Sequence, residues 1–160
     1  MNSLIILVSY HHKNTEKIAQ QIAKILGSEI KSPEQIDPNS MQASDLIGFG
    51  SGVYFGKLDK KLLELADKLP QLTGKKAFVF STSGRTGKGA LKFHQSIKEK
   101  LQAKGLTITG EFNCGGFDTY GIFKISGGKN KGRPNADDLK QAETFAQNIA
   151  KNEPSTIYVE

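Results

Sequence analysis

The chain has 160 residues, of which 37% are hydrophobic and 24% charged, a composition typical of one globular domain with a sizeable core rather than of a disordered segment. No apolar run is long enough to span a bilayer, and the first three residues lead directly into a short strand pattern. We therefore expect no signal peptide, no membrane partner and a cytoplasmic location. A single cysteine, Cys114, excludes an internal disulfide and argues against a thiolate metal site.

The formal net charge is +6, which makes nucleic acid the first partner to consider. The basic residues are, however, spread along the chain. Even the densest stretch, residues 124–133, holds four basic residues among many glycines and no arginine cluster. No RNP-like aromatic motif is present either. We therefore expect no nucleic-acid binding, and an acidic protein partner is the better explanation of the charge.

Strand and helix patterns alternate along the chain. Strand patterns are expected at residues 4–8, around 29–30, at 46–49, at 77–80 and at 106–112. Helix patterns follow at residues 18–26, 58–69, 91–101 and 134–149. This alternation predicts an α/β fold with a five-stranded parallel sheet and helices on both faces. One domain is expected over residues 1–151, followed by a tail at 152–160 with at most a short extended piece at 156–159.

Polar and glycine-rich segments follow the expected carboxyl ends of four strands. They comprise residues 9–15, 50–57, 81–89 and 115–121. Ligands of open α/β sheets bind at this edge, where the strand order reverses. The first segment precedes a helix, whose unpaired N–H groups and partial positive charge suit a phosphate. Together the four segments predict a site for one elongated ligand with a phosphate at one end.

Two other nucleotide motifs are incomplete. The segment SGRTGKG at residues 83–89 differs from a Walker A loop, because Thr82 occupies the position of its first glycine and Lys88 is followed by Gly89. The spaced glycines near residue 50 do not complete G-x-G-x-x-G, because position 53 is Val. Neither a P-loop NTPase nor a nicotinamide-binding Rossmann domain is therefore favoured.

The first loop and its helix, YHHKNTEKIA at residues 10–19, resemble the phosphate loop of the flavodoxins. In that family a hydroxyl-rich turn ending in Asn-Thr precedes a helix and wraps the phosphate of FMN. Asn14 and Thr15 match this ending, whereas His11, His12 and Lys13 replace small hydroxyl residues and a glycine. The alternative is a surface turn in which Asn14 or Thr15 caps the helix.

The other loops resemble the same family in order and spacing. GSGVYFGKLDKKL at residues 50–62 is similar to the loop that places an aromatic ring beside the isoalloxazine, here Tyr54 or Phe55. FSTSGRTGKG at 80–89 resembles the loop whose backbone N–H groups reach the N5, O4 and N3 edge. NCGGFDTYG at 113–121 is similar to the segment that covers the flavin, and residues 132–146 to the final helix. The resemblance implies a flavodoxin-like three-layer sandwich with strand order 2-1-3-4-5.

The resemblance implies FMN as the cofactor. The implied contacts are Ser9, Tyr10, His11, His12, Lys13, Asn14 and Thr15 in the first loop, Gly52, Val53, Tyr54, Phe55 and Gly56 in the second, Ser81, Thr82, Ser83, Gly84 and Arg85 in the third, and Gly116, Phe117 and Asp118 in the fourth. Asp118 is either a proton relay near the flavin or a turn residue. His94 and Cys114 are interpreted as ordinary structural residues, and no catalytic or metal-binding residue is assigned.

The expected function is electron transfer between redox partners. One alternative is an FMN-dependent NAD(P)H:quinone-type or related small-molecule oxidoreductase, and another is a flavin-free interaction module with the same fold. The charged residues of the four loops are Lys13, Lys57, Arg85 and Lys88 against Asp59 and Asp118. This excess of positive charge predicts an acidic docking partner.

Overall fold

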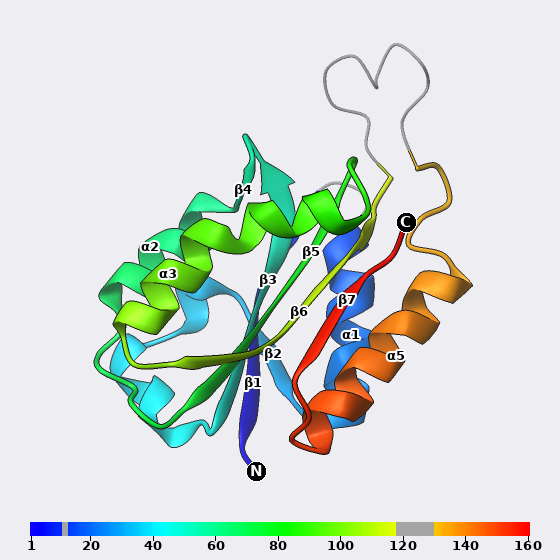
Figure 1. Ribbon diagram of the computed structural model, residues 1–160. Helices are drawn as coiled ribbons and strands as arrows, with labels where there is room; N and C mark the ends of the chain where they lie inside the picture. Colours follow the sequence, from blue (N-terminus) through cyan, green and yellow to red (C-terminus); the bar gives the residue numbers. More distant parts are fainter. Residues whose placement is uncertain (11–12, 118–129) are drawn as a thin grey trace.

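The computed structural model describes residues 1–10, 13–117 and 130–160 (Figure 1). Its centre is a seven-stranded sheet whose main path runs β2-β1-β3-β5-β6-β7, with β4 paired to β3 off this path. The strands are β1 (Ser3–Val8), β2 (Glu29–Lys31), β3 (Leu46–Tyr54), β4 (Lys57–Leu58), β5 (Lys76–Ser83), β6 (Thr107–Gly115) and β7 (Ser155–Tyr158). Neighbours on the main path are parallel, and β3 and β4 are antiparallel.

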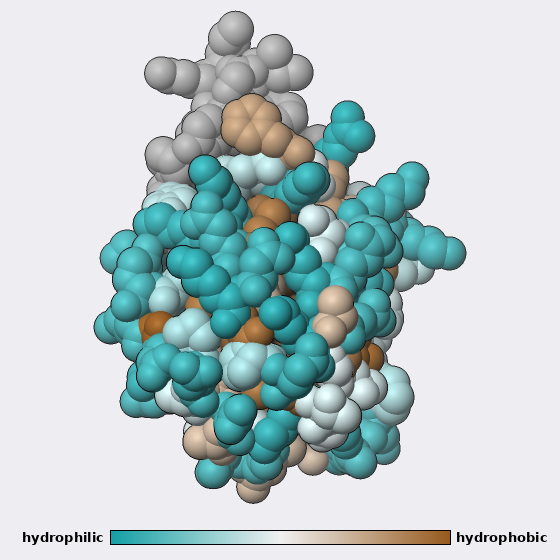
Figure 2. All heavy atoms as spheres, turned by 90° about the vertical axis from the view of Figure 1, so that its left-hand side faces the viewer, coloured by the Kyte–Doolittle hydropathy of each residue, from teal (hydrophilic) through white to brown (hydrophobic). Residues whose placement is uncertain are grey.

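Helices cover both faces of the sheet, which gives three layers (Figure 1). The α-helices are α1 (Asn14–Leu26), α2 (Lys60–Lys68), α3 (Gln95–Ala103) and α5 (Ala136–Ala150). The 3₁₀ helices are η1 (Pro33–Gln35), η2 (Pro38–Ala43) and η3 (Lys88–His94). One buried apolar cluster lies between the sheet and α2 and α3, and a second lies between the sheet and α1 and α5. The outer face formed by α2 and α3 is largely hydrophilic (Figure 2).

Two glycines of β3 allow phenylalanine rings of β5 to pack across the sheet. A Cβ atom on Gly48 would lie 2.3 Å from the Phe78 ring, and one on Gly50 would lie 2.1 Å from the Phe80 ring. Both rings are fully buried. The glycines of this strand are therefore required for packing in the middle of the sheet, not for a turn.

The expected fold class and the order of the five expected strands are confirmed, because β2-β1-β3-β5-β6 follows the order 2-1-3-4-5. The expected number of strands was wrong, since two short strands were missed. β4 is the return strand of a hairpin at the end of β3, and two residues are too few to show an alternating pattern. β7 lies in the segment expected as a tail, close to the extended piece predicted there, and pairs with β6. Within the described ranges, no helix has both the length and the apolar character needed to cross a bilayer.

The Gly50→Ala substitution tests the packing of β5 on β3. The new methyl group has no space beside the Phe80 ring, so we expect the free energy of unfolding to fall by about 1–3 kcal/mol. Urea unfolding measures this change. Gly89→Ala is the matched control, because a Cβ atom at Gly89 would meet nothing within 4 Å. Equal stabilities of the two variants would contradict the packing argument.

Candidate functional site

The carboxyl ends of β1, β3, β5 and β6 lie at one edge of the sheet and carry the loops singled out in the sequence (Figure 1). The chain order reverses between β1 and β3, because β2 follows β1 on one side while β3 lies on the other. This is the topological switch point at which open α/β sheets bind ligands. Of the predicted contact residues, His11, His12 and Asp118 lie outside the described residues.

The N-terminus of α1 is open to an anion. Its N-cap residue, Lys13, adopts a left-handed conformation with φ 51° and ψ 37° and gives no side-chain cap. Ser9 Oγ accepts a hydrogen bond from the Glu16 N–H at 3.3 Å. In the described part of the chain, no group accepts a hydrogen bond from the N–H of Asn14 or Thr15. The helix-cap alternative is not observed, because Lys13 occupies the N-cap position of α1 and no hydrogen bond from an α1 N–H to the side chain of Asn14 or Thr15 is found among the described residues. Two donors at the positive end of a helix dipole remain for a ligand.

Hydrogen bonds join the first, third and fourth loops to one another. Thr15 Oγ1 and Thr82 Oγ1 are 2.8 Å apart and buried. Asn14 Nδ2 donates to the Phe117 carbonyl at 2.9 Å, and the Gly116 N–H donates to the Ser83 carbonyl at 3.1 Å. These hydrogen bonds fix the first, third and fourth loops relative to one another.

Asn14 also provides an acceptor that is not used by any of the described residues. Its Oδ1 atom is buried and takes no hydrogen bond from the residues that the structure describes. A buried acceptor without a donor is costly, so such an atom marks a place for a ligand donor. A ligand hydroxyl suits it, and so the pair Asn14–Thr15 fits a phosphate joined to a polyhydroxyl chain.

The segment at residues 130–133, which the sequence analysis did not select, holds the third and fourth loops in place. Asn130 Nδ2 donates to the carbonyls of Gly84 at 2.9 Å and Ser83 at 3.3 Å. The Phe117 N–H donates to the Arg133 carbonyl at 3.0 Å. Residues 130–133 are thus hydrogen-bonded to the backbones of the third and fourth loops.

Arg133 is itself held by α5. Its Nε donates to Asp138 Oδ2 at 2.9 Å, and the fully buried Asp138 carboxylate also accepts from the Asn135 N–H. The hydrogen bond to Asp138 raises the pKa of the Arg133 guanidinium. The signal in the sequence is the capping box of Asn135 and Asp138, which places a carboxylate near the arginine two residues before the cap.

The second loop is a two-residue hairpin between β3 and β4. Phe55 and Gly56 both have positive φ, 53° and 77°, as in a type I′ turn. The Phe55 side chain is fully exposed at the tip. Tyr54 packs over Gly52, where a Cβ atom would lie 2.9 Å from the Tyr54 hydroxyl.

Tyr10 from the first loop meets Tyr54 from the second. Their ring centroids are 6.1 Å apart with an interplanar angle of 59°. A flat ligand between two rings needs them parallel and about 7 Å apart, twice the optimal carbon–carbon separation. The two tyrosines therefore contact each other rather than forming a slot, and a flat ring has to lie on one side of the pair. Val53, which precedes Tyr54, is half-buried against the core under α2.

The third loop offers backbone rather than side-chain groups. The Ser81 hydroxyl is fully buried and lies 2.7 Å from His94 Nε2, and the Ser83 hydroxyl donates to the Arg85 carbonyl. With Thr82 paired to Thr15, the hydroxyls of this strand end are all engaged within the protein. Gly84 and the exposed Arg85 remain at the site.

Positive charge predominates at the described rim of the site. The side chains of Lys13, Lys57, Arg85 and Lys88 are exposed. Asp59, in contrast, is buried and accepts from the Lys61 N–H at 2.8 Å as the N-cap of α2. Its carboxylate is therefore engaged at the start of α2 and is not exposed at the rim. Cys114 is buried below the site, and burial raises the pKa of its thiol, which makes it a poor nucleophile.

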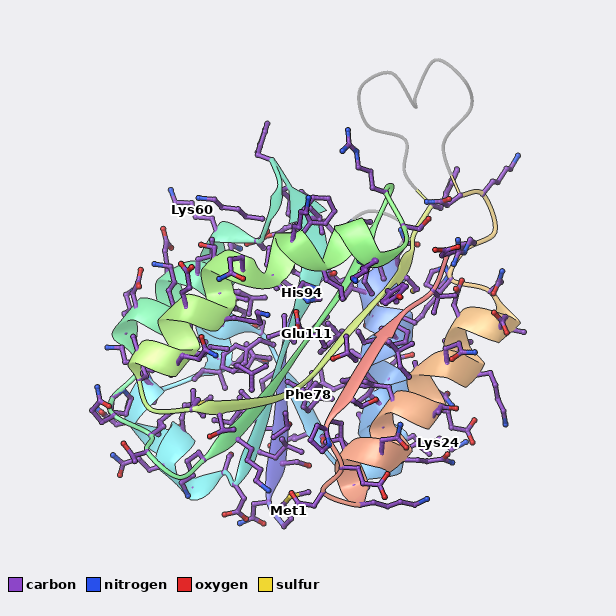
Figure 3. The ribbon with its side chains drawn as sticks, viewed as in Figure 1. Met1, Lys24, Lys60, Phe78, His94 and Glu111 are labelled. Atoms are coloured by element: carbon purple, nitrogen blue, oxygen red, sulfur yellow. The ribbon has the colours of Figure 1, made fainter. Side chains whose placement is uncertain are left out.

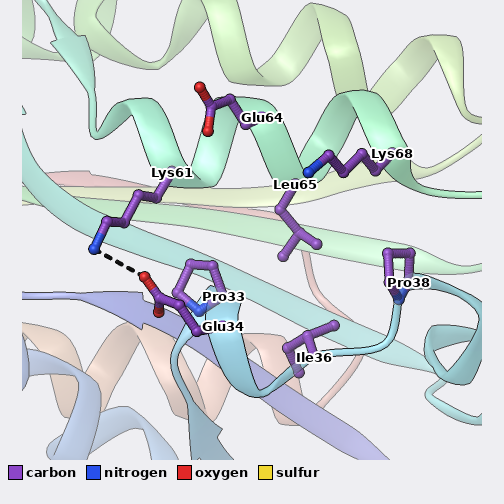
Figure 4. Close-up of a pocket in the computed structure, with 8 residues that line it drawn as sticks. All are labelled: Pro33, Glu34, Ile36, Pro38, Lys61, Glu64, Leu65 and Lys68. Carbon is purple, nitrogen blue, oxygen red and sulfur yellow. Dashed lines mark ion pairs between the residues drawn. The ribbon is translucent and has the colours of Figure 1, made fainter.

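A separate surface depression of about 250 Å³ lies along α2 (Figure 4). Its lining residues are Pro33, Glu34, Ile36, Pro38, Lys61, Glu64, Leu65 and Lys68. Lys61 pairs there with Glu34 at 2.8 Å and also lies 5.7 Å from the centre of the Tyr10 ring. This depression therefore meets the rim of the site at Lys61 but is not formed by the carboxyl-end loops.

Comparisons with known proteins agree with this geometry. The family model described as a flavodoxin domain matches residues 5–120. An uncharacterized protein of Methanocaldococcus jannaschii is 49% identical over 152 residues, which cover 95% of this chain and 100% of that protein.

Solved flavodoxins have the same fold at low sequence identity. Oxidised Flavodoxin 2 from Bacillus cereus has a TM-score of 0.72 and 19% identity, with 95% of this chain and 99% of that chain covered. The flavodoxin of Fusobacterium nucleatum bound to flavin mononucleotide has a TM-score of 0.65 and 13% identity, with 96% and 99% covered. Because the family model matches most of its length, the chain belongs to the flavodoxin family.

Proposed function

We propose that the protein binds FMN at the carboxyl-end loops and carries electrons between redox partners in the cytoplasm. The observation that supports this best is the open N-terminus of α1, where two N–H donors and the unused Asn14 Oδ1 atom lie side by side in sequence. A phosphate fits the donors, and a hydroxyl of the ribityl chain fits the acceptor. Bound FMN would supply one- and two-electron chemistry.

The other described loops provide the proposed contacts to the isoalloxazine ring. The hairpin with Tyr54 and Phe55 offers aromatic surface to the isoalloxazine ring, and the backbone of residues 83–85 offers groups for its polar edge. Gly116 and Phe117 cover it from β6, and their positions are held by Ser83, Asn14 and Arg133. His11, His12 and Asp118 complete the proposed set of contacts.

The exposed aromatic and basic side chains at the rim of the site favour an electron carrier over a quinone-type oxidoreductase. Phe55 is a fully exposed aromatic residue at the tip of the second loop, which also carries the exposed Lys57, and the third loop carries the exposed Arg85. An aromatic anchor with a charged surround is typical of a protein-docking surface. The partner proposed is a redox protein with acidic residues at its docking face.

Binding of FMN and riboflavin to the flavin-free protein tests the cofactor assignment. Charge-assisted hydrogen bonds to the phosphate contribute about 1.5–3 kcal/mol each, so we expect FMN to bind at least tenfold more tightly than riboflavin. Quenching of flavin fluorescence gives both dissociation constants. Equal affinities would exclude the phosphate site, and an absence of binding would favour the flavin-free interaction module. Turnover of NAD(P)H with menadione would instead support the oxidoreductase.

Reversal of charge at the rim tests the electrostatic part of the proposal. Positive charge near the ring favours the reduced, more negative flavin, so the Arg85→Glu/Lys88→Glu variant should have a more negative reduction potential than the wild type. Spectroelectrochemical titration at low salt measures the difference, which should shrink as salt is added.

The Lys24→Glu/Lys68→Glu variant is the matched control. It makes the same change in net charge at exposed residues near the C-terminal ends of α1 and α2, and Lys24 lies far from the carboxyl edge (Figure 3). Identical potentials for the two variants would mean that the rim charges do not act on the flavin.

A further inference from the structure

Two consecutive glycines at the end of β6 leave room for polar side chains from other parts of the chain. A Cβ atom on Gly115 would lie 2.7 Å from Arg133 Nη1, and one on Gly116 would lie 2.9 Å from Asn14 Nδ2. Arg133 precedes α5, and Asn14 is the first residue of α1. The guanidinium and the amide therefore pack against adjacent residues of the same strand end.

The next residue, Phe117, connects Arg133 and Asn14 through its backbone. Its N–H donates to the Arg133 carbonyl at 3.0 Å, and its carbonyl accepts from Asn14 Nδ2 at 2.9 Å. The position of the Arg133 backbone thus decides where the Phe117 carbonyl lies, and this carbonyl is the acceptor that Asn14 meets. A continuous path of contacts therefore runs from residue 133 to the N-terminus of α1.

The Phe117 carbonyl sets the orientation of the Asn14 amide. A carbonyl oxygen only accepts hydrogen bonds, so it has to face Nδ2 and not Oδ1. The Oδ1 atom then lies at the other end of the amide, where it is buried and takes no hydrogen bond from the described residues. Turning the amide would bring two acceptors together, so Asn14 offers a ligand an acceptor. The ligand group that matches it is a donor such as a hydroxyl, and not a phosphate oxygen.

Arg133 is fixed in turn by the first turn of α5. Its Nε and Nη2 atoms donate to the two carboxylate oxygens of Asp138, which has no exposed surface. The same carboxylate accepts from the Asn135 N–H at 2.8 Å and belongs to the capping box of the helix. A two-pronged ion pair of this kind restrains the direction of a guanidinium as well as its distance. Arg133 is therefore tied to a rigid element and not only to a loop.

We propose that Arg133 is a positioning residue of the flavin site. Its ion pair with Asp138 fixes the Phe117 carbonyl, and this carbonyl holds the Asn14 amide with its acceptor turned to a hydroxyl of the ligand. The role requires no contact between Arg133 and the ligand. The flavin part of this statement rests on the proposed function, whereas the coupling between Arg133 and the Asn14 amide does not.

Two variants disturb the Arg133 side chain in different ways. Arg133→Lys keeps the positive charge, which the buried Asp138 needs, but replaces the planar fork with a single ammonium group. Gly115→Ala leaves every charge in place, and its new methyl group displaces the guanidinium that lies 2.7 Å from the Cβ position. Lys131→Gln is the matched control, because this side chain is exposed and lies in the same segment.

NMR of the flavin-free protein tests the coupling without a ligand. In Arg133→Lys and in Gly115→Ala we expect the Phe117 backbone amide signal and the Asn14 side-chain amide signals to shift together. In Lys131→Gln both sets should stay in place. The coupling is wrong if the Phe117 signal moves while the Asn14 side-chain signals stay, or if neither moves in either variant.

A double-mutant cycle on FMN affinity tests whether Arg133 acts through Asn14. Loss of one hydrogen bond to a neutral group corresponds to about fivefold in affinity, and we expect Arg133→Lys to lower FMN binding by this factor. In the Asn14→Ala background the same change should have no further effect, because the acceptor is already absent. A residue that only stabilises the fold would lower the affinity equally in both backgrounds.

Riboflavin separates the hydroxyl contact from the phosphate contact. It has the same ribityl hydroxyls as FMN but no phosphate, so Arg133→Lys should weaken both ligands by the same factor. The ratio of the two affinities then stays as in the wild type. A ratio that changes would show that Arg133 acts on the phosphate and would contradict the assignment of Asn14 Oδ1 to a hydroxyl.

The outcomes distinguish this inference from the proposed function. Coupled NMR signals in a protein that binds neither FMN nor riboflavin would reject the proposed cofactor and retain the control of the Asn14 amide by Arg133. Tight FMN binding with equal losses in both backgrounds of the cycle would retain the cofactor and reject the positioning role.

Discussion

A buried hydroxyl has to find a hydrogen-bond partner, and at the carboxyl edge of this sheet the partner of Thr15 is Thr82. Thr15 lies in the first turn of α1, and Thr82 lies near the end of β5. The strand between β1 and β5 is β3, so the bond reaches across its end. β3 has glycine at positions 50 and 52, and Gly52 pairs in register with Thr82. A side chain at Gly52 would meet the Tyr54 ring, since a Cβ atom there would lie 2.9 Å from the Tyr54 hydroxyl.

The other bonds at this edge depend on the same arrangement. With α1 placed against β5, Asn14 reaches the Phe117 carbonyl and leaves its Oδ1 for a ligand. Residues 130–133 then close the third and fourth loops through backbone carbonyls. Acidic side chains beside these loops serve the framework, since Asp59 caps α2 and Asp138 pairs with Arg133. Basic side chains are more numerous than acidic ones at the described rim, where Glu16 lies in the first turn of α1 and Glu160 lies beside Gly87.

The alternation of strands and helices and the positions of the loops could be predicted because they depend on short-range patterns, whereas the order of the strands in the sheet was predicted from the resemblance to the flavodoxins. The apolar run at residues 4–8 and the polar segments after three later strands are visible in the chain itself. The two short strands were missed because β4 and β7 form only where a turn or the return of α5 brings them beside a longer strand. Residue contacts between distant segments were missed for the same reason. His94 is 13 residues from Ser81 and 17 from Glu111, and no local pattern marks a helix-end histidine as the centre of a buried cluster. Asn130 likewise gains its role only from the approach of residues 83 and 84.

A double-mutant cycle at Thr15 and Thr82 tests the central claim most directly. Thr15→Val, Thr82→Val and the double variant remove the hydroxyls while keeping the side-chain volume, and urea unfolding gives the free energy of each. If the bond between the two hydroxyls joins α1 to β5, the two single changes are not additive. The double variant should then be more stable than their sum predicts, with a coupling energy of about 0.5–3 kcal/mol. Additive effects would show that the two threonines act independently, and would contradict the account of how the loops are held.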